Sequence, residues 1–328
     1  MAICALATLG CREKAVVPAR PTLAVFNLYV SAVVVAADQS ERIGARTDCF
    51  ADAGLAPTVI KASKGPEIVD ALIGGSADFG TLAVTPVVFQ ALQGSDLVIF
   101  ATIQTTDRDI KVVGRRSAGI DSGPSLRGKR VGYVGGTFGE IYLNRYLEKH
   151  GLKREDISLT SAGPAQLRDL FLGEQVEAVV IWEPVVQDIL ADPQVDASDV
   201  FIDVDRTLYT GRINLVARPQ VLKEKRADAE KLVRALLCGE RLIKERPAEV
   251  REALESWLQR PEGTLSEVFD ASTFVVELDI PGLVSGLEEE AEWAQEAVFN
   301  GRAEMPADFR RLVDPSILEA VAPDRVKR

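Results

Sequence analysis

The segment from Leu126 to Glu140, LRGKRVGYVGGTFGE, constrains the fold more than any other part of the chain. It reads as a polar turn, a short apolar strand at 130–134, a glycine pair, and a helix that begins at Thr137. This order directs backbone N–H groups and the positive end of a helix dipole toward one place. We therefore expect this segment to form one wall of a cleft for a small ligand.

Composition limits the class of protein. The chain has 328 residues, of which 47% are hydrophobic and 27% are charged, and this is enough apolar surface for two globular domains. A net charge of −11 argues against a nucleic-acid partner, because such a protein needs a basic face to neutralise phosphates. After the first dozen residues, no apolar run reaches the roughly 18 to 20 residues that span a bilayer.

The first eleven residues, MAICALATLGC, are small and apolar, and charged residues follow. This stretch resembles the end of a bacterial lipoprotein leader, in which cleavage before a cysteine leaves that residue, here Cys11, to carry the lipid. A basic segment is missing, and Thr-Leu-Gly precedes the cysteine where Leu-small-Gly is usual, so an ordinary terminus stays open as the alternative. We expect residues 1–20 to be a leader and tether that place the protein in the periplasm or on the outer face of the cytoplasmic membrane.

Two internal cysteines, Cys49 and Cys238, remain after such a leader. We interpret them as buried free thiols, with a disulfide as the alternative in an exported protein. His150 is the only histidine, so histidine-based zinc sites and Ser-His-Asp catalysis have almost nothing to use. We expect no metal, no cofactor and no catalytic residue.

Strand-like and helix-like segments alternate along most of the chain. The expected strands are 22–29, 57–62, 77–81, two runs within 96–115, 130–134, 158–161, 176–182, 200–204 and 213–217. Helices are expected at 31–54, at 65–73 and after Thr85 and Pro86, a pair typical of a helix start. The remainder is expected to be largely helical, with the acidic run 288–290 on a solvated helix face. This alternation predicts an α/β fold with mostly parallel sheets.

Four segments carry a family resemblance. They are 74–94, 126–152, 170–186 and 314–326. In their order and spacing the chain resembles the solute-binding proteins of ABC importers in the nitrate, sulfonate, taurine and thiamine-pyrimidine group. The resemblance implies the two-lobed type II periplasmic binding protein fold, with two crossing strands that join lobe 1 (21–105 and 215–328) to lobe 2 (106–214). It also implies a monomer that delivers its ligand to a membrane permease.

Ligands of open α/β sheets lie beyond the carboxyl ends of the strands, where loops lead into helix N-termini. The ligand-binding residues predicted on this basis are Asn27, Tyr29, Ser31, Thr81, Thr85, Thr106, Gly135, Gly136, Thr137, Phe138, Trp182 and Glu183. The three residues Ser31, Thr85 and Thr137 have an alternative role as plain helix caps. The glycines of the central segment match neither the G-x-G-x-x-G dinucleotide fingerprint nor a P-loop, so no nucleotide is predicted.

Trp182 and Glu183 are the predicted specificity residues. A Trp at a strand end can stack on a flat or alkyl ligand, and Glu183 favours an amino group or cation. The alternative is a buried Trp with Glu183 in a surface ion pair. The only arginine near the predicted loops is Arg108, so we expect the helix N-termini to hold an anion moderately. These features predict a small polar ligand, namely a sulfonate, an amino-sulfonate or another zwitterion, or an aminated heterocycle, rather than nitrate. We expect it to be captured as the strands near 104–109 and 212–214 flex.

Two rival classes of protein stay open. One is an enzyme on the same fold that acts on a small acid or a pyrimidine precursor. The pyrimidine-forming relatives rely on histidine and a cysteine-rich iron motif, whereas this chain has one histidine and no cysteine cluster. The other is a sensory effector domain, which normally comes with a helix-turn-helix or a membrane span. We expect a binding protein that is not an enzyme.

Overall fold

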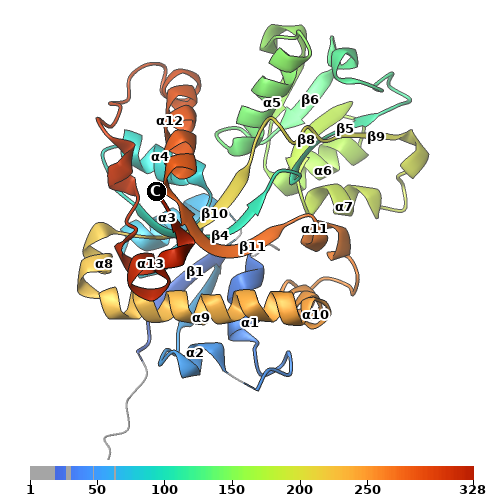
Figure 1. The fold of residues 1–328 in the computed structure, drawn as a ribbon. Helices are drawn as coiled ribbons and strands as arrows, with labels where there is room; N and C mark the ends of the chain where they lie inside the picture. Colours follow the sequence, from blue (N-terminus) through green and yellow to red (C-terminus); the bar gives the residue numbers. More distant parts are fainter. Residues whose placement is uncertain (1–18, 27–30, 47, 63) are drawn as a thin grey trace, which may run out of the picture.

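The computed structural model describes residues 19–26, 31–46, 48–62 and 64–328, and its chain forms two β-sheets with helices around each (Figure 1). Cys11, Asn27 and Tyr29 lie outside the described residues. The first sheet has the order β12 (Val326–Lys327), β11 (Thr273–Asp279), β4 (Val98–Thr106), β10 (Gly211–Ala217), β3 (Phe79–Leu82), β1 (Thr22–Phe26) and β2 (Thr58–Ala62). The second has the order β7 (Ser158–Ser161), β6 (Arg130–Tyr133), β8 (Ala178–Trp182), β5 (Ile110–Arg115) and β9 (Val200–Asp203). We call each sheet with its helices the first lobe and the second lobe.

The predicted α/β class is confirmed, but the sheets are mixed rather than mostly parallel. In the first lobe β1 runs parallel to β2 and β3, whereas β10 runs antiparallel to β3 and β4. In the second lobe β6 runs parallel to β7 and β8, whereas β5 runs antiparallel to β8 and β9. The antiparallel strands β4, β5 and β10 are those that carry the chain between the sheets, so they do not follow the parallel βαβ pattern.

The helices of the first lobe form two layers. One layer contains α1 (Ala32–Asp38), α2 (Cys49–Asp52), α9 (Arg226–Glu245), α10 (Pro247–Trp257) and α13 (Ser316–Val321). The other contains α3 (Gly65–Ile73), α4 (Val84–Leu92) and α12 (Ile280–Ala297). The short helices α8 (Pro219–Glu224) and α11 (Ser266–Asp270) flank them. Figure 1 shows α9 running along the base of this lobe and α12 rising beside the second lobe.

One predicted helix in the first lobe is wrong. The helix expected at 31–54 is broken: α1 ends at Asp38 with Gln39 as its C-cap, Gly44 takes a positive φ of 76°, and the Asp48 side chain caps a new helix by accepting a hydrogen bond from the N–H of Ala51. The C-terminal part is largely helical, as predicted, and it also contributes β11, which lies beside β4 in the first sheet. Its side chains alternate in burial, which is the period-2 pattern of a half-buried strand.

The second sheet is covered on both faces by α5 (Phe138–Lys149), α6 (Pro164–Leu172) and α7 (Val185–Leu190). Neighbouring residues of its central strands point to opposite faces, as the pleat requires. Val112 and Val180 pack in the apolar cluster that includes α5 residues. Val113 and Val179 pack in the cluster that includes residues of α6 and α7. This double burial holds the N-terminus of α5 firmly at one end of the sheet.

Cys49 and Cys238 form a disulfide, so the interpretation as free thiols is wrong. Their Cα atoms are 5.7 Å apart although 189 positions separate them in the sequence, because α2 packs beside α9. A cross-link that closes so long a loop restricts the unfolded chain and is worth about 2–5 kcal/mol.

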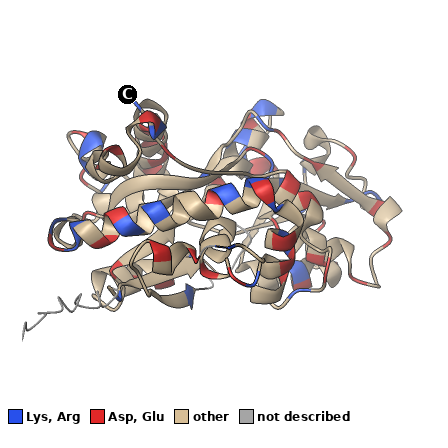
Figure 2. Ribbon diagram, turned by 60° about the horizontal axis from the view of Figure 1, so that its bottom comes forward, with Lys and Arg blue, Asp and Glu red and all other residues tan. Residues whose placement is uncertain are grey.

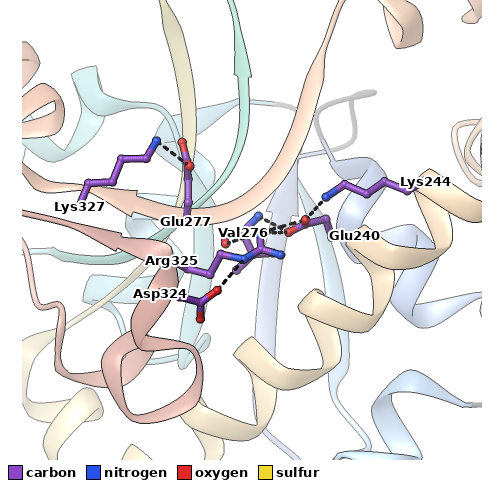
Figure 3. Close-up of polar contacts among 7 residues, drawn as sticks. All are labelled: Glu240, Lys244, Val276, Glu277, Asp324, Arg325 and Lys327. Carbon is purple, nitrogen blue, oxygen red and sulfur yellow. Dashed lines mark hydrogen bonds and ion pairs between the residues drawn. The ribbon is translucent and has the colours of Figure 1, made fainter.

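The C-terminal segment is fastened to the first lobe by a buried carboxylate, Glu240 of α9 (Figure 3). Arg325 donates to both carboxylate oxygens at 3.0 and 3.1 Å, and the N–H of Val276 donates at 2.7 Å. Lys244 adds a third donor. Burial raises the pKa of Glu240, but these donors outweigh it and leave that pKa below its ordinary value.

Charged residues of both signs are interspersed over the helices, as Figure 2 shows along α9. Among the described residues, the structure contains no helix that combines the length and the apolar character needed to cross a membrane.

Candidate ligand cleft

A cleft lies where β4 and β10 leave the first sheet and β5 begins the second. Its empty volume is about 400 Å³, including the part open to solvent. The lining residues used below are Gln104, Thr106, Phe138, Tyr209, Gly211 and Arg212. The crossing strands are in register here, with Gly211 opposite Thr106 and Arg212 opposite Thr105. The cleft therefore has both lobes as walls and the crossing strands as floor.

Arg212 of β10 is the arginine among the lining residues of this cleft. Its guanidinium lies against α12, where a Cβ built on Gly282 or Gly286 would come within 3.3 or 3.7 Å of its nitrogens. Within the part of the chain that the structure describes, this guanidinium makes no ion pair and no hydrogen bond. Sequence reasoning placed only Arg108 near the site, and that residue is about half exposed and pairs with Asp107 at 3.5 Å.

The aromatic wall of the cleft comes from the start of α5. Phe138 stacks on Tyr209 with ring centroids 5.8 Å apart and lies 4.6 Å from Trp182 in a tilted contact. Phe138 and Tyr209 line the cleft, whereas Trp182 packs behind Phe138 and against Gly139, where an added Cβ would approach it to 3.1 Å. Trp182 thus supports the aromatic wall from behind.

Glu183 does not offer its charge to the cleft. It is only 2% exposed and forms an ion pair with Lys111 of the neighbouring strand β5. The N–H of Gln187 donates to its other oxygen at 3.3 Å. Because a buried lysine neutralises the carboxylate, the predicted selection of a ligand amino group by Glu183 loses its physical basis.

The glycine loop at 135–137 satisfies most of its own polar groups. The N–H of Gly135 donates to Ser161 Oγ at 3.2 Å, and the N–H of Gly136 donates to Glu140 Oε2 at 2.9 Å. The Thr137 hydroxyl accepts from the N–H of Gly139 at 3.2 Å and donates to a carbonyl at 2.7 Å. Its role as the N-cap of α5 is confirmed, and these donors face protein acceptors.

The hydroxyls predicted from the first lobe have different surroundings. Ser31 stands at the N-cap position of α1, but its hydroxyl donates to the carbonyl of Phe26 and makes no capping hydrogen bond. Thr81 accepts from the N–H of Phe26 at 3.1 Å. Thr106 lines the cleft and accepts from the N–H of Arg108 at 3.2 Å. Of these three, the structure places Thr106 at the cleft and gives Ser31 and Thr81 structural partners.

A buried polar cluster stands behind Tyr209, whose hydroxyl donates to Glu290 Oε1 at 2.9 Å. Glu290 is 4% exposed, and both its Oε2 and the Thr85 hydroxyl lack a hydrogen bond of good geometry. Burial raises the pKa of Glu290 to about 7, against the lowering effects of Thr85, Tyr209 and the charges of Arg145 and Arg212. The Thr85 hydroxyl is therefore close enough to act on the carboxylate without being aligned with it.

Two predictions about this cluster are wrong. Thr85 is not the N-cap of α4, because the helix begins one residue earlier, at Val84, with Ala83 as its cap. The run 288–290 is not wholly a solvated face either. Glu288 and Glu289 are exposed, but Glu290 turns toward α4, which packs against α12.

His150 lies far from the cleft. It caps the C-terminal end of α5 and contacts the ring of Tyr146 with centroids 4.5 Å apart. The helix has 12 residues, or about 18 Å, and Phe138 begins its other end. Among the described residues, no group of three or more His, Cys, Asp or Glu side chains could hold a metal ion.

The two lobes touch on both sides of the cleft. On one side Arg145 of α5 pairs with Glu289 of α12 at 3.0 Å. On the other side Gln187 of α7 donates to Glu267 of α11 at 3.4 Å, and Asp188 pairs with Arg260. The cleft is thus bounded by contacts between helices of different lobes.

Two sheets joined by crossing strands, with a cleft at the crossing, define the fold of the periplasmic binding proteins. The periplasmic aliphatic sulphonate binding protein SsuA from Escherichia coli superposes with a TM-score of 0.74 at 20% identity, covering 90% of this chain and 97% of that one. The periplasmic nitrate-binding protein NrtA from Synechocystis PCC 6803 superposes with a TM-score of 0.72 at 13% identity, covering 94% and 89%. At these identities the likeness establishes the fold alone.

Sequence comparison gives the family. A curated protein of Escherichia coli (strain K12), named as a binding protein for aliphatic sulfonates, is 30% identical over 159 residues, which are 48% of this chain and 49% of that protein. A binding protein of Brucella abortus (strain 2308) is 30% identical over 124 residues, 38% of this chain and 37% of that protein. The chain thus matches half or less of the length of these relatives. The model of the family described as NMT1/THI5 like matches residues 43–250, and the chain belongs to that family.

Proposed function

We propose that this protein captures a small organic anion, of the sulfonate class, between its two lobes and delivers it to an ABC importer. The observation that carries the proposal is Arg212, a cation without a protein partner among the described residues, at the crossing of the strands. A guanidinium presents several N–H donors in one plane, which suits the oxygens of a sulfonate or carboxylate. The names of the relatives, which include binding proteins for sulfonates and nitrate, support the same role.

Arg212 changes the expected chemistry of the ligand. The sequence favoured a zwitterion or an aminated heterocycle because Glu183 looked available and no arginine lay within the predicted loops. Glu183 is paired with Lys111, and Arg212 lines the cleft. The proposed ligand is therefore an anion whose organic part packs on Phe138 and Tyr209, so an amino group is no longer required.

The proposed mechanism is capture by hinge closure. The crossing strands near Thr106 and Arg212 connect the lobes, and the pairs across the cleft, such as Arg145 with Glu289, hold it shut. Breaking such exposed pairs costs little, about 0–1 kcal/mol each, so the lobes can separate to admit a ligand. Closure then presents both lobes to a membrane permease. We place the protein outside the cytoplasmic membrane, with Cys11 as the proposed lipid attachment site.

Calorimetry with one matched pair of variants tests the proposal. Arg212→Gln should weaken binding of ethanesulfonate by about 10- to 100-fold, the loss expected for one charged hydrogen-bonding group. Arg108→Gln removes an arginine of the same crossing region that already pairs with Asp107, and it should change affinity less than about 3-fold. The panel includes taurine, nitrate and an aminopyrimidine. Equal losses in both variants, or binding of the aminopyrimidine alone, would contradict the proposed anion site.

A further inference from the structure

The cluster of Tyr209, Glu290 and Thr85 lies directly behind the proposed anion site and has no role in it so far. Tyr209 faces the cleft with its ring and donates to Glu290 with its hydroxyl. The guanidinium of Arg212, a residue of β10, lies against Gly282 and Gly286 of α12, the helix that also carries Glu290. A single carboxylate thus connects a cleft aromatic residue with the neighbourhood of the cleft cation.

Two buried oxygens in this cluster lack a partner. They are Oε2 of Glu290 and Oγ1 of Thr85, in residues that are 4% and 2% exposed. A buried carboxylate oxygen without a donor is costly, and the cost falls when the group takes a proton. The Thr85 hydroxyl suits either state of Glu290, since it can donate to an ionised Oε2 or accept from a protonated one.

Few charges hold Glu290 in its ionised form. Among the described residues, the charged or titratable groups acting on it are Arg212 of β10, Arg145 of α5 and Tyr209. Of the other elements packed on α12, the segment Phe309–Leu312 carries Arg310 and Arg311, and β12 carries Lys327. Arg311 pairs with Asp96, and Lys327 pairs with Glu277 of β11.

Arg145 is itself shared with Glu289 at the surface. Arg212 is therefore, beside Arg145, one of the two arginines whose charge acts on Glu290. An anion bound in the cleft competes directly for it.

We propose that anion capture is linked to a proton: an anion that takes the charge of Arg212 leaves Glu290 with Arg145 as its remaining counter-charge, and Glu290 then binds a proton from solvent. This inference rests on the anion site proposed above and adds a positioning residue to it. The step forms one O–H bond on Glu290, and the proton comes from water or buffer. The anion and the proton together add no net charge to the protein.

The sign of the pH effect follows from the cluster. Before the anion binds, Glu290 has a pKa of about 7, so it is mostly protonated at pH 6 and mostly ionised at pH 8. Loss of the Arg212 charge raises the pKa further. Affinity should therefore be flat below about pH 6 and weaken about 5- to 10-fold by about pH 8, with uptake of about 0.4 to 0.9 proton per anion there.

Calorimetry in buffers of different ionisation enthalpy measures this uptake. Ethanesulfonate is the probe, because its sulfonate does not titrate in this range. Glu290→Gln should abolish the uptake and make affinity independent of pH, whereas Glu290→Asp should restore uptake. Glu289→Gln is the matched control, since it removes the adjacent carboxylate, 56% exposed and paired with Arg145, and should keep the uptake.

Two results overturn the proton linkage alone. One is binding of ethanesulfonate at both pH 6 and pH 8 without proton uptake at pH 8. The other is unchanged proton uptake in Glu290→Gln. Failure of ethanesulfonate and the other anions to bind at any pH overturns the proposed function, and the linkage falls with it.

Discussion

Glu240 and Glu290 are two glutamates of the first lobe with nearly the same burial, 2% and 4% exposed, and opposite surroundings. Glu240 joins α9 to the C-terminal segment and accepts hydrogen bonds from Arg325, Lys244 and the backbone of Val276. These donors hold its pKa below the ordinary value despite burial.

Glu290, beside the cleft, accepts one hydrogen bond of good geometry, from Tyr209, and its pKa rises to about 7. Both the donors and the depth of burial separate the two carboxylates, since the donors outweigh desolvation at Glu240 and desolvation dominates at Glu290. A carboxylate with three donors serves as a permanent structural charge. A carboxylate with a single donor, near a cation that a ligand can engage, can change its charge when the ligand binds.

Glu240→Gln should have the larger effect on stability. A carboxylate with a lowered pKa stabilises the fold above its unfolded value of about 4.5, and the contribution is lost as the pH falls through the folded pKa. We expect the free energy of unfolding to fall by about 2–3 kcal/mol near pH 7, with a smaller difference below about pH 4. Urea unfolding at both pH values measures this.

The control for Glu240→Gln is Glu277→Gln, which breaks the more exposed pair with Lys327 and should cost about 0.5 kcal/mol. Similar losses in the two variants would mean that the buried donors around Glu240 add nothing. The comparison with Glu290 would then fail.

Glu290→Gln should change stability in the opposite direction. A pKa raised from 4.5 to about 7 means that ionised Glu290 opposes folding. This cost is nearly absent below about pH 4.5 and complete above about pH 7. The variant should therefore gain about 3 kcal/mol at about pH 8 and less than about 0.5 kcal/mol at about pH 4.5. Thermal unfolding across this range would contradict the assignment if the variant lost stability equally at every pH.

Local sequence signals predicted the second-lobe wall well. The strand, the glycine pair and the cap of the central segment appear as β6 and the N-terminus of α5, with Thr137 as N-cap. These features depend on a few adjacent residues, so propensity and capping chemistry suffice. The predicted Phe138 wall also lines the cleft.

The same local signals did not predict which residues distant in the sequence pair with each other. Arg212 enters the cleft because β10 returns antiparallel to β4 and places it opposite Thr105. Glu183 is neutralised because β5 brings Lys111 beside β8. Periodicity shows which face of an element is apolar, but it does not show which charge from another strand will meet a carboxylate there. The prediction of a solvated face at 288–290 was wrong for the same reason, since the packing of α4 on α12 buries only the last residue of this run.

The threonines Thr137 and Thr85 repeat the contrast at a smaller scale. The Thr137 hydroxyl makes two hydrogen bonds that start α5, whereas the Thr85 hydroxyl has no aligned partner. Thr137→Val should lower the free energy of unfolding by about 1 kcal/mol, the usual value of an N-cap. Thr85→Val should change it by less than about 0.5 kcal/mol, because no formed hydrogen bond is lost. The Thr85 hydroxyl lowers the pKa of Glu290, so Thr85→Val should raise that pKa. The pH range over which stability falls should then extend to higher pH, which urea unfolding between pH 6 and pH 8 would detect. A loss of stability in Thr85→Val as large as in Thr137→Val would show that its hydroxyl is satisfied, and Glu290 would then have a second donor like those of Glu240.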